Sequence, residues 1–142
     1  MKINKENIII DCSFNNKTEA IKFIGLELLN RGLIHKEYID SMIERDKKHS
    51  VAIGNFIAIP HGEYESKKYI LKNGILIIKL KEVLLWDEQE VKVIIALALA
   101  GDDQLEMLQS IGVAFSDEQE VNKVYSFKTI DEIYNYFLNI DL

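Results

Sequence analysis

Apolar residues alternate with polar ones, or run together, in strand-like patterns at several places along the chain. The pattern at residues 6–11 is short and typical of an edge strand, while Val91–Leu99 is the most apolar run and is expected to form a central strand covered on both faces. Pro60 closes the apolar segment before it, because it cannot donate to a strand ladder. The expected strands cover residues 6–11, 56–59, 75–80, 83–86 and 91–99.

Helical spacing of apolar residues, together with capping residues, predicts five helices. Three of them begin with a capping residue that is followed three positions later by Glu or Gln. Asp102 is expected to cap the third helix, whose Leu105 and Ile111 should face inward. The expected helices cover residues 17–31 after Asn16, residues 36–47, residues 103–115, a segment from Ser116 to about Tyr125, and a segment from Thr129 to about Asn139.

Helices before, between and after the strands predict an α/β fold. Several strands follow one another through connections that are too short for parallel crossovers. We therefore expect a mixed parallel/antiparallel sheet of about five strands, flanked by helices on both faces.

Composition narrows the possible partners. The chain has 142 residues, of which 48% are apolar and 28% charged, so residues 1–142 are expected to form a single domain. The net charge of −6 and the lack of a Lys/Arg cluster argue against nucleic acid and favour a basic protein partner. No apolar run approaches the roughly 20 residues of a membrane span. The first residues lack the apolar core of a secretory signal, so no membrane insertion and a cytoplasmic location are expected.

Cysteine and histidine content argues against a metal site. Cys12 is the only cysteine, which excludes an intramolecular disulfide. His35, His49 and His61 do not match the spacing of zinc ligands. We expect no bound metal.

The segment Ile57–Gly62 is the best candidate for chemistry. Pro60 favours extended geometry at Ile59, so His61 should lie just past a strand on a fixed backbone. Gly62 has no Cβ, which would allow another molecule to approach the imidazole and the chain to turn with positive φ. A Pro-His-Gly triplet is a weak signal by itself, because a lone histidine is more often a hydrogen-bonded structural residue.

Longer motifs strengthen this interpretation. They are Asn7-Ile8, Glu19-Ala20-Ile21, Tyr38 with Met42-Ile43-Glu44-Arg45, and the run from Ala52 through Pro60-His61-Gly62. Together they resemble the enzyme IIA domain of the bacterial phosphoenolpyruvate-dependent sugar phosphotransferase system, in its mannitol/fructose class. The resemblance covers nearly the whole chain, and the length is similar to that of the free-standing mannitol-type protein without fused carrier domains.

The resemblance implies that His61 is phosphorylated by the carrier protein HPr and passes the phosphoryl group to a cysteine of a sugar-specific enzyme IIB. Mannitol, another polyol or fructose is the implied sugar, and the resemblance implies that the protein itself needs no metal or organic cofactor. Arg45 matches an arginine of the family motif, and its fork-shaped charge suits a phosphoryl group. A salt bridge from Arg45 to Glu44 or Asp46 is the alternative. Backbone N–H groups near Gly62 are expected to donate to the phosphoryl oxygens.

One position departs from the family pattern. Mannitol-type relatives have a second histidine at the start of the helix after the central strand, where this chain has Gln104. Gln104 can donate a hydrogen bond but cannot become positively charged. Asp102 and Asp103 beside it are expected to complement the helix dipole.

Other residues near the motif have less specific expectations. Glu63 is expected at the edge of the pocket, where a carboxylate would raise the pKa of the histidine. His49 should be solvated, and Trp86 should lie in the core rather than on a docking face.

Two other functions remain open. A regulatory enzyme IIA-like module, which reports phosphorylation state to another protein, would be less affected by a neutral Gln104. A hydrolase that uses His61 as a general base has no recognisable partner motif.

Overall fold

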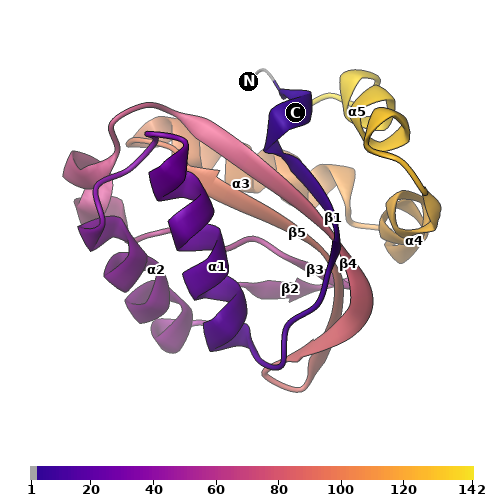
Figure 1. The fold of residues 1–142 in the computed structure, drawn as a ribbon, viewed down its shortest axis with the longest axis horizontal. Coiled ribbons are helices and arrows are strands. Elements are labelled where there is room, and N and C mark those ends of the chain that lie inside the picture. The colour runs from indigo at the N-terminus through magenta and orange to yellow at the C-terminus, as the bar shows by residue number, and fades with distance from the viewer. Residues whose placement is uncertain (1–2) are drawn as a thin grey trace.

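A five-stranded sheet runs through the centre of the computed structural model, which describes residues 3–142 (Figure 1). The strand order is β1-β4-β5-β3-β2, in which β1 and β3 pair parallel with their inner neighbours and the other two pairs are antiparallel. The expected mixed α/β sheet, with an early edge strand and a central strand near residue 95, is thus confirmed. The strands are β1 (Ile8–Cys12), β2 (Ala52–Gly54), β3 (Ile57–Ala58), β4 (Gly74–Trp86) and β5 (Gln89–Ala98).

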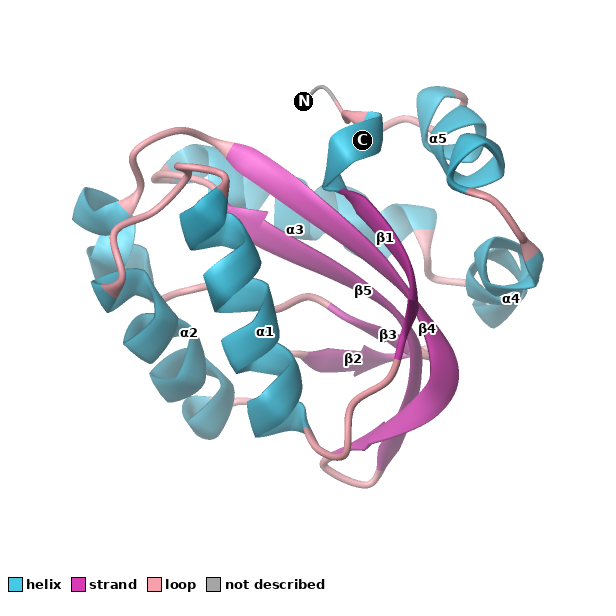
Figure 2. Ribbon diagram, viewed as in Figure 1, coloured by secondary structure: helices cyan, strands magenta, loops and turns pink. Residues whose placement is uncertain are grey.

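Helices cover both faces of this sheet (Figure 2). One apolar core lies between the sheet and α1 and α2, and a second lies between the sheet and α3, α4 and α5. Within residues 3–142, no helix combines the length and the apolar character that crossing a membrane demands. The helices are α1 (Lys17–Asn30), α2 (Glu37–Lys48), α3 (Asp102–Ala114), α4 (Glu118–Ser126) and α5 (Ile130–Leu138), with short 3-10 helices η1 (Lys5–Asn7) and η2 (Tyr64–Tyr69).

The caps of α1 and α5 are as expected, whereas those of α3 and α4 differ. The side chain of Asn16 accepts from the backbone N–H of Glu19, and Thr129 forms a capping box at α5. Helix α4 is capped by Asp117 instead of Ser116, because Asp117 accepts from the second N–H of the helix. At α3 the N-cap is Gly101, with a φ of 61° that glycine adopts without strain. Asp102 is therefore the first residue of that helix rather than its cap.

Two features of the sheet differ from the prediction. Residues 75–80 and 83–86 form one continuous strand, β4, whose pairing with β5 shifts register between Lys79 and Leu84. Strand β2 lies where a loop was expected. It forms a hairpin with β3 through Asn55 and Phe56, whose positive φ values of 53° and 69° resemble a type I′ turn.

Parallel pairing of β3 with β5 positions the candidate site. The carboxyl ends of the two strands lie together, and α3 starts just beyond the end of β5. The backbone N–H of Leu97 donates to the carbonyl of Pro60 at 2.9 Å, which extends the pairing past the end of β3. His61 is therefore held against the end of the central strand, in the position where open α/β sheets commonly bind ligands.

Candidate functional site

His61 is held in a single orientation by the residue two positions before it. Its side chain is 5% exposed, and its Nδ1 lies 2.6 Å from the carbonyl oxygen of Ile59. A carbonyl oxygen can only accept a hydrogen bond, so Nδ1 carries the proton. Nε2 is then left with a free lone pair, which is the form of imidazole that attacks an electrophile.

The surroundings of His61 favour its neutral form. Burial lowers the pKa of His61 below its usual 6.5, and the positive charge of Arg45 lowers the pKa further. The hydrogen bond to Ile59 and the carboxylate of Glu63 raise the pKa, but they only partly offset burial. The imidazole is consequently neutral at pH 7 and available as a nucleophile.

Gly62 does not have the role that we expected. Its φ is not positive, and its N–H already donates to the hydroxyl of Tyr38 at 2.8 Å. A Cβ at this position would lie 2.5 Å from Cε1 of Tyr38, which is closer than such atoms approach. Glycine is thus required by the packing of Tyr38, and the Gly62 N–H has no free hydrogen for a phosphoryl oxygen. Nor is the imidazole open to wide approach, since His61 is almost fully buried.

Gln104 contacts the residue that follows His61. It is in the first turn of α3, is 5% exposed, and donates from Nε2 to the carbonyl of Gly62 at 3.3 Å. The next residue, Leu105, was expected to face inward but is 47% exposed. Gln104 takes the inward position of this turn, and its side chain holds the peptide that follows His61.

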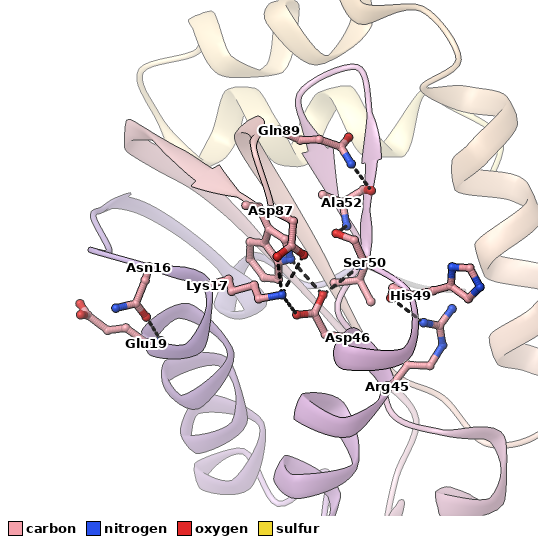
Figure 3. A network of polar contacts seen from close by, with 12 residues as sticks. Asn16, Lys17, Glu19, Arg45, Asp46, His49, Ser50, Ala52, Asp87 and Gln89 are labelled. Atoms are coloured by element: carbon pink, nitrogen blue, oxygen red, sulfur yellow. Dashed lines mark hydrogen bonds and ion pairs between the residues drawn. The ribbon is translucent and has the colours of Figure 1, made fainter.

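Arg45 is near His61 and does not form the alternative salt bridge. Its Nη1 donates to the backbone carbonyl of His49 at 2.8 Å, while the side chain of His49 is exposed (Figure 3). The neighbouring carboxylates have other partners, because Glu44 pairs with Lys47 and Asp46 pairs with Lys17. Most of the N–H donors of the Arg45 guanidinium therefore remain available to another ligand.

Asp46 forms a buried polar network that sequence reasoning did not identify (Figure 3). Its carboxylate is almost fully buried, with Oδ1 accepting from the N–H of Val51 and from Nε1 of Trp86, each at 3.0 Å. Its Oδ2 lies 2.8 Å from Nζ of Lys17, which also contacts Asp87. The network ties the last turn of α2 to the loop before β2 and to the β4–β5 turn. It thereby fixes the helical turn that carries Arg45.

Trp86 lies in the core, as expected, and supplies one of these donors. The one hint of the Asp46 network in the sequence was Trp86 itself, because the indole N–H of a buried tryptophan usually finds an acceptor. Asp46 itself lies in the charged run Glu44-Arg45-Asp46-Lys47, in which a solvated side chain would be the ordinary expectation.

The remaining acidic residues lie at the margin of the site. Glu63 is partly buried, and its Oε1 lies 2.8 Å from Nζ of Lys48. Asp102 and Asp103 are exposed in the first turn of α3, where their charge complements the helix dipole. Within residues 3–142, no three His, Cys, Asp or Glu side chains gather so as to hold a metal ion.

Comparison with known proteins finds relatives along the whole chain. The family model described as "Phosphoenolpyruvate-dependent sugar phosphotransferase system, EIIA 2" matches residues 1–140. The mannitol-specific phosphotransferase enzyme IIA component of Mycoplasma pneumoniae is 38% identical over 132 residues, which cover 93% of this chain and 92% of that protein.

Two solved structures have a similar fold and are more than a quarter identical in sequence. The crystal structure of IIA mannitol from Escherichia coli has a TM-score of 0.87 at 27% identity, and the match covers 95% of this chain and 98% of that one. The complex of enzyme IIAMtl with phosphorylated enzyme IIBMtl from Escherichia coli has a TM-score of 0.88 at 26% identity. That match covers 96% of this chain and 97% of the other.

Proposed function

Because the chain belongs to the EIIA 2 family of the phosphoenolpyruvate-dependent sugar phosphotransferase system, we propose that it carries a phosphoryl group on His61, from HPr to a cysteine of an enzyme IIB. The family membership confirms the resemblance inferred from the sequence. The observation that carries the proposal is the hydrogen bond from Nδ1 of His61 to Ile59, because it leaves Nε2 unprotonated.

The first transfer requires no auxiliary base. The Nε2 lone pair attacks the phosphorus of phosphohistidine on HPr, so a new N–P bond forms while the old N–P bond breaks and the HPr imidazole leaves. The imidazole of His61 gains positive charge, which the carbonyl of Ile59 stabilises through the Nδ1 proton. Arg45 contributes positive charge beside the phosphoryl oxygens.

The second transfer reverses this sequence at Nε2. A cysteine thiolate of enzyme IIB attacks the phosphorus, the N–P bond of His61 breaks, and Nε2 recovers its lone pair. The relative in the Escherichia coli complex is bound to phosphorylated enzyme IIB, which supports an equivalent partner for this chain. The relatives are mannitol-specific, which supports mannitol as the sugar of the system. Because the proposed exchange is with HPr, we expect the protein to act in the cytoplasm.

Phosphotransfer in a purified system tests the proposal directly. The protein is incubated with enzyme I, HPr and labelled phosphoenolpyruvate, and then with separate mannitol, fructose and other polyol enzyme IIB proteins. We expect one phosphoryl group per chain, stable in alkali and labile in acid as phosphohistidine is, followed by transfer to the mannitol enzyme IIB. Absence of labelling in the presence of phosphorylated HPr would contradict the proposal.

Replacing Arg45 should slow the reaction without unfolding the protein. Arg45→Gln removes a partly buried charge next to the phosphoryl position, and we expect the transfer rate to fall about tenfold to a hundredfold. Lys47→Gln is the matched control, because Lys47 is on the same helix and is 66% exposed. Rapid-quench kinetics with phosphorylated HPr measure both variants, and equal rates for the two would contradict a role for Arg45.

Gln104→His introduces a titratable side chain at the position where the family resemblance implies a second histidine. Histidine gains its charge in acid, so we expect the ratio of the variant's transfer rate to that of the natural protein to be a few fold higher at pH 6 than at pH 8. Gln109→His places the same residue on the exposed side of α3 and serves as the control. A rate ratio that does not change with pH would show that a charge at this position does not limit transfer.

A regulatory role is the second candidate, and the neutral, hydrogen-bonded Gln104 favours it. A sensor needs a phosphorylated state but no rapid onward transfer. The same panel of enzyme IIB proteins separates the two functions, because a sensor would be labelled on His61 and would then pass the label to none of them.

A further inference from the structure

One side of helix α2 contacts the peptides that follow His61. Tyr38, Ser41 and Arg45 are spaced three and four residues apart, so they lie in a row along one face of the helix. Tyr38 and Ser41 hold the backbone after the histidine, and Arg45 comes at the end of the row, beside the imidazole. The same helix face therefore supplies both the charge of the proposed site and two fixed contacts to its backbone.

Tyr38 links the residue after His61 to the central strand. Its hydroxyl accepts from the Gly62 N–H at 2.8 Å and donates to the carbonyl of Leu97 on β5 at 3.0 Å. The side chain is 1% exposed, and burial raises the pKa of Tyr38 to about 12, so the hydroxyl keeps its proton at neutral pH. The ring also fills the space where a side chain at Gly62 would be.

Ser41 and Gln104 hold the next two groups of this backbone. The Ser41 hydroxyl accepts from the N–H of Glu63 at 2.8 Å and donates to the hydroxyl of Ser66 at 2.6 Å. Gln104 donates to the carbonyl of Gly62. The backbone of Gly62 is thus held at its N–H by one helix and at its carbonyl by another, so the segment that carries the imidazole of His61 is fixed from two sides.

We propose that Tyr38 is a positioning residue for phosphoryl transfer, which acts by holding the Gly62 N–H so that the His61 Nδ1–H points at Ile59 and Nε2 keeps its lone pair. Ser41 supports this geometry one residue further along. The proposal rests on the proposed function of His61. It adds that the tautomer and direction of the imidazole depend on a hydroxyl that does not touch the phosphoryl group.

Tyr38→Phe tests this role by removing a single oxygen. The Gly62 N–H then loses its acceptor, the loop relaxes, and we expect the rate of phosphorylation by HPr to fall about tenfold or more, because small misplacements of a nucleophile have large effects. Nitrogen-15 NMR of the His61 ring should show an increased share of the Nε2–H tautomer. Tyr136→Phe is the matched control, since its hydroxyl binds Glu120 in the other core, and both quantities should stay as in the natural protein.

Two results would overturn the proposal. One is an unchanged rate together with an unchanged tautomer ratio in Tyr38→Phe. The other is a slower rate with the natural tautomer ratio, which would indicate a general loss of stability. If Tyr38→Phe does not fold, Ser41→Ala provides the same two measurements against Ser126→Ala, whose hydroxyl binds only its own helix.

The NMR measurement also separates this proposal from the proposed function. If the natural protein is not labelled by HPr, then the function proposed for His61 fails. The tautomer ratio in Tyr38→Phe still decides whether Tyr38 orients the imidazole.

Discussion

Replacing His61 with alanine is expected to abolish phosphorylation of the protein by HPr. The reaction needs a lone pair on a nitrogen that is held in place, and Nε2 of His61 is the one that the structure provides beside Arg45. His35 and His49 are both exposed and contribute no imidazole nitrogen to this site. The measurement is the amount of label per chain after incubation with enzyme I, HPr and labelled phosphoenolpyruvate.

His49→Ala is the matched control for this experiment. The hydrogen bond between His49 and Arg45 is made by the backbone carbonyl of His49, which alanine retains, so labelling should continue at the natural rate. Unfolding curves of both variants show whether each remains folded. A His61→Ala protein that is folded and still labelled would exclude His61 as the phosphoryl carrier.

The pH dependence of the natural protein gives a further check on His61. Because burial and Arg45 lower its pKa, more than half of the imidazole is neutral at pH 6.5. The rate with HPr should therefore stay above half of its pH 8 value down to pH 6.5 and fall further in more acidic solution. The stability of the protein changes with pH in the same direction. The unfolded chain binds this proton at a higher pH than the folded protein does, so the free energy of unfolding falls as the pH drops below about 6.5.

Asp46→Ala is expected to cause the largest loss of stability among the polar substitutions considered above. The change leaves the Val51 N–H and the Trp86 indole without their acceptor and leaves Lys17 without its buried partner. Breaking a buried, hydrogen-bonded ion pair on one side costs about 3–5 kcal/mol, a large share of a typical folding free energy of about 5–15 kcal/mol. Urea unfolding followed by tryptophan fluorescence reports on this region, because Trp86 is the only tryptophan.

Asp87→Ala separates burial from charge in the same network. Asp87 pairs with the same Lys17, but its side chain is 40% exposed, so we expect a loss of about 1 kcal/mol or less in unfolding free energy. Asp46→Asn keeps an oxygen for Val51 and Trp86 and should fall between the two. Equal losses for Asp46→Ala and Asp87→Ala would show that the buried contacts of Asp46 contribute little.

Local signals in the sequence predicted those parts of the fold that depend on local contacts. The Asn16 cap, the capping box at Thr129 and the apolar run of β5 each specify their element within a few residues of sequence. The hairpin of β2 and β3 was missed because its turn, Asn55-Phe56, lacks the glycine that usually marks positive φ. The apolar pattern also gave a wrong prediction at the start of α3. Leu105 was expected to face inward, but it is exposed, and the polar Gln104 is buried instead.

The identities of the proposed site residues came from the resemblance, whereas their contacts came from the structure. His61, Arg45 and Gln104 lie close together because β3, α2 and α3 meet at the end of β5, which no local pattern specifies. The contact of Tyr38 with Gly62 joins residues 24 positions apart, and that of Asp46 with Trp86 joins residues 40 apart. Such contacts depend on how the elements pack together, so the roles of Gly62 and Asp46 could not be read from the sequence.

The strand order also determines when each part of the molecule can form during synthesis. Strand β1 pairs only with β4, so the N-terminal strand has no partner until Gly74–Trp86 has been made. The loop that holds His61 needs Leu97, which binds both Pro60 and Tyr38. Helices α1 and α2 can form early from local contacts, whereas these pairings join residues far apart in sequence and are slow to form. A nascent chain that stops before β5 therefore contains the whole Ile57–Gly62 segment but not the hydrogen bonds to Leu97 that hold the loop of His61 in place.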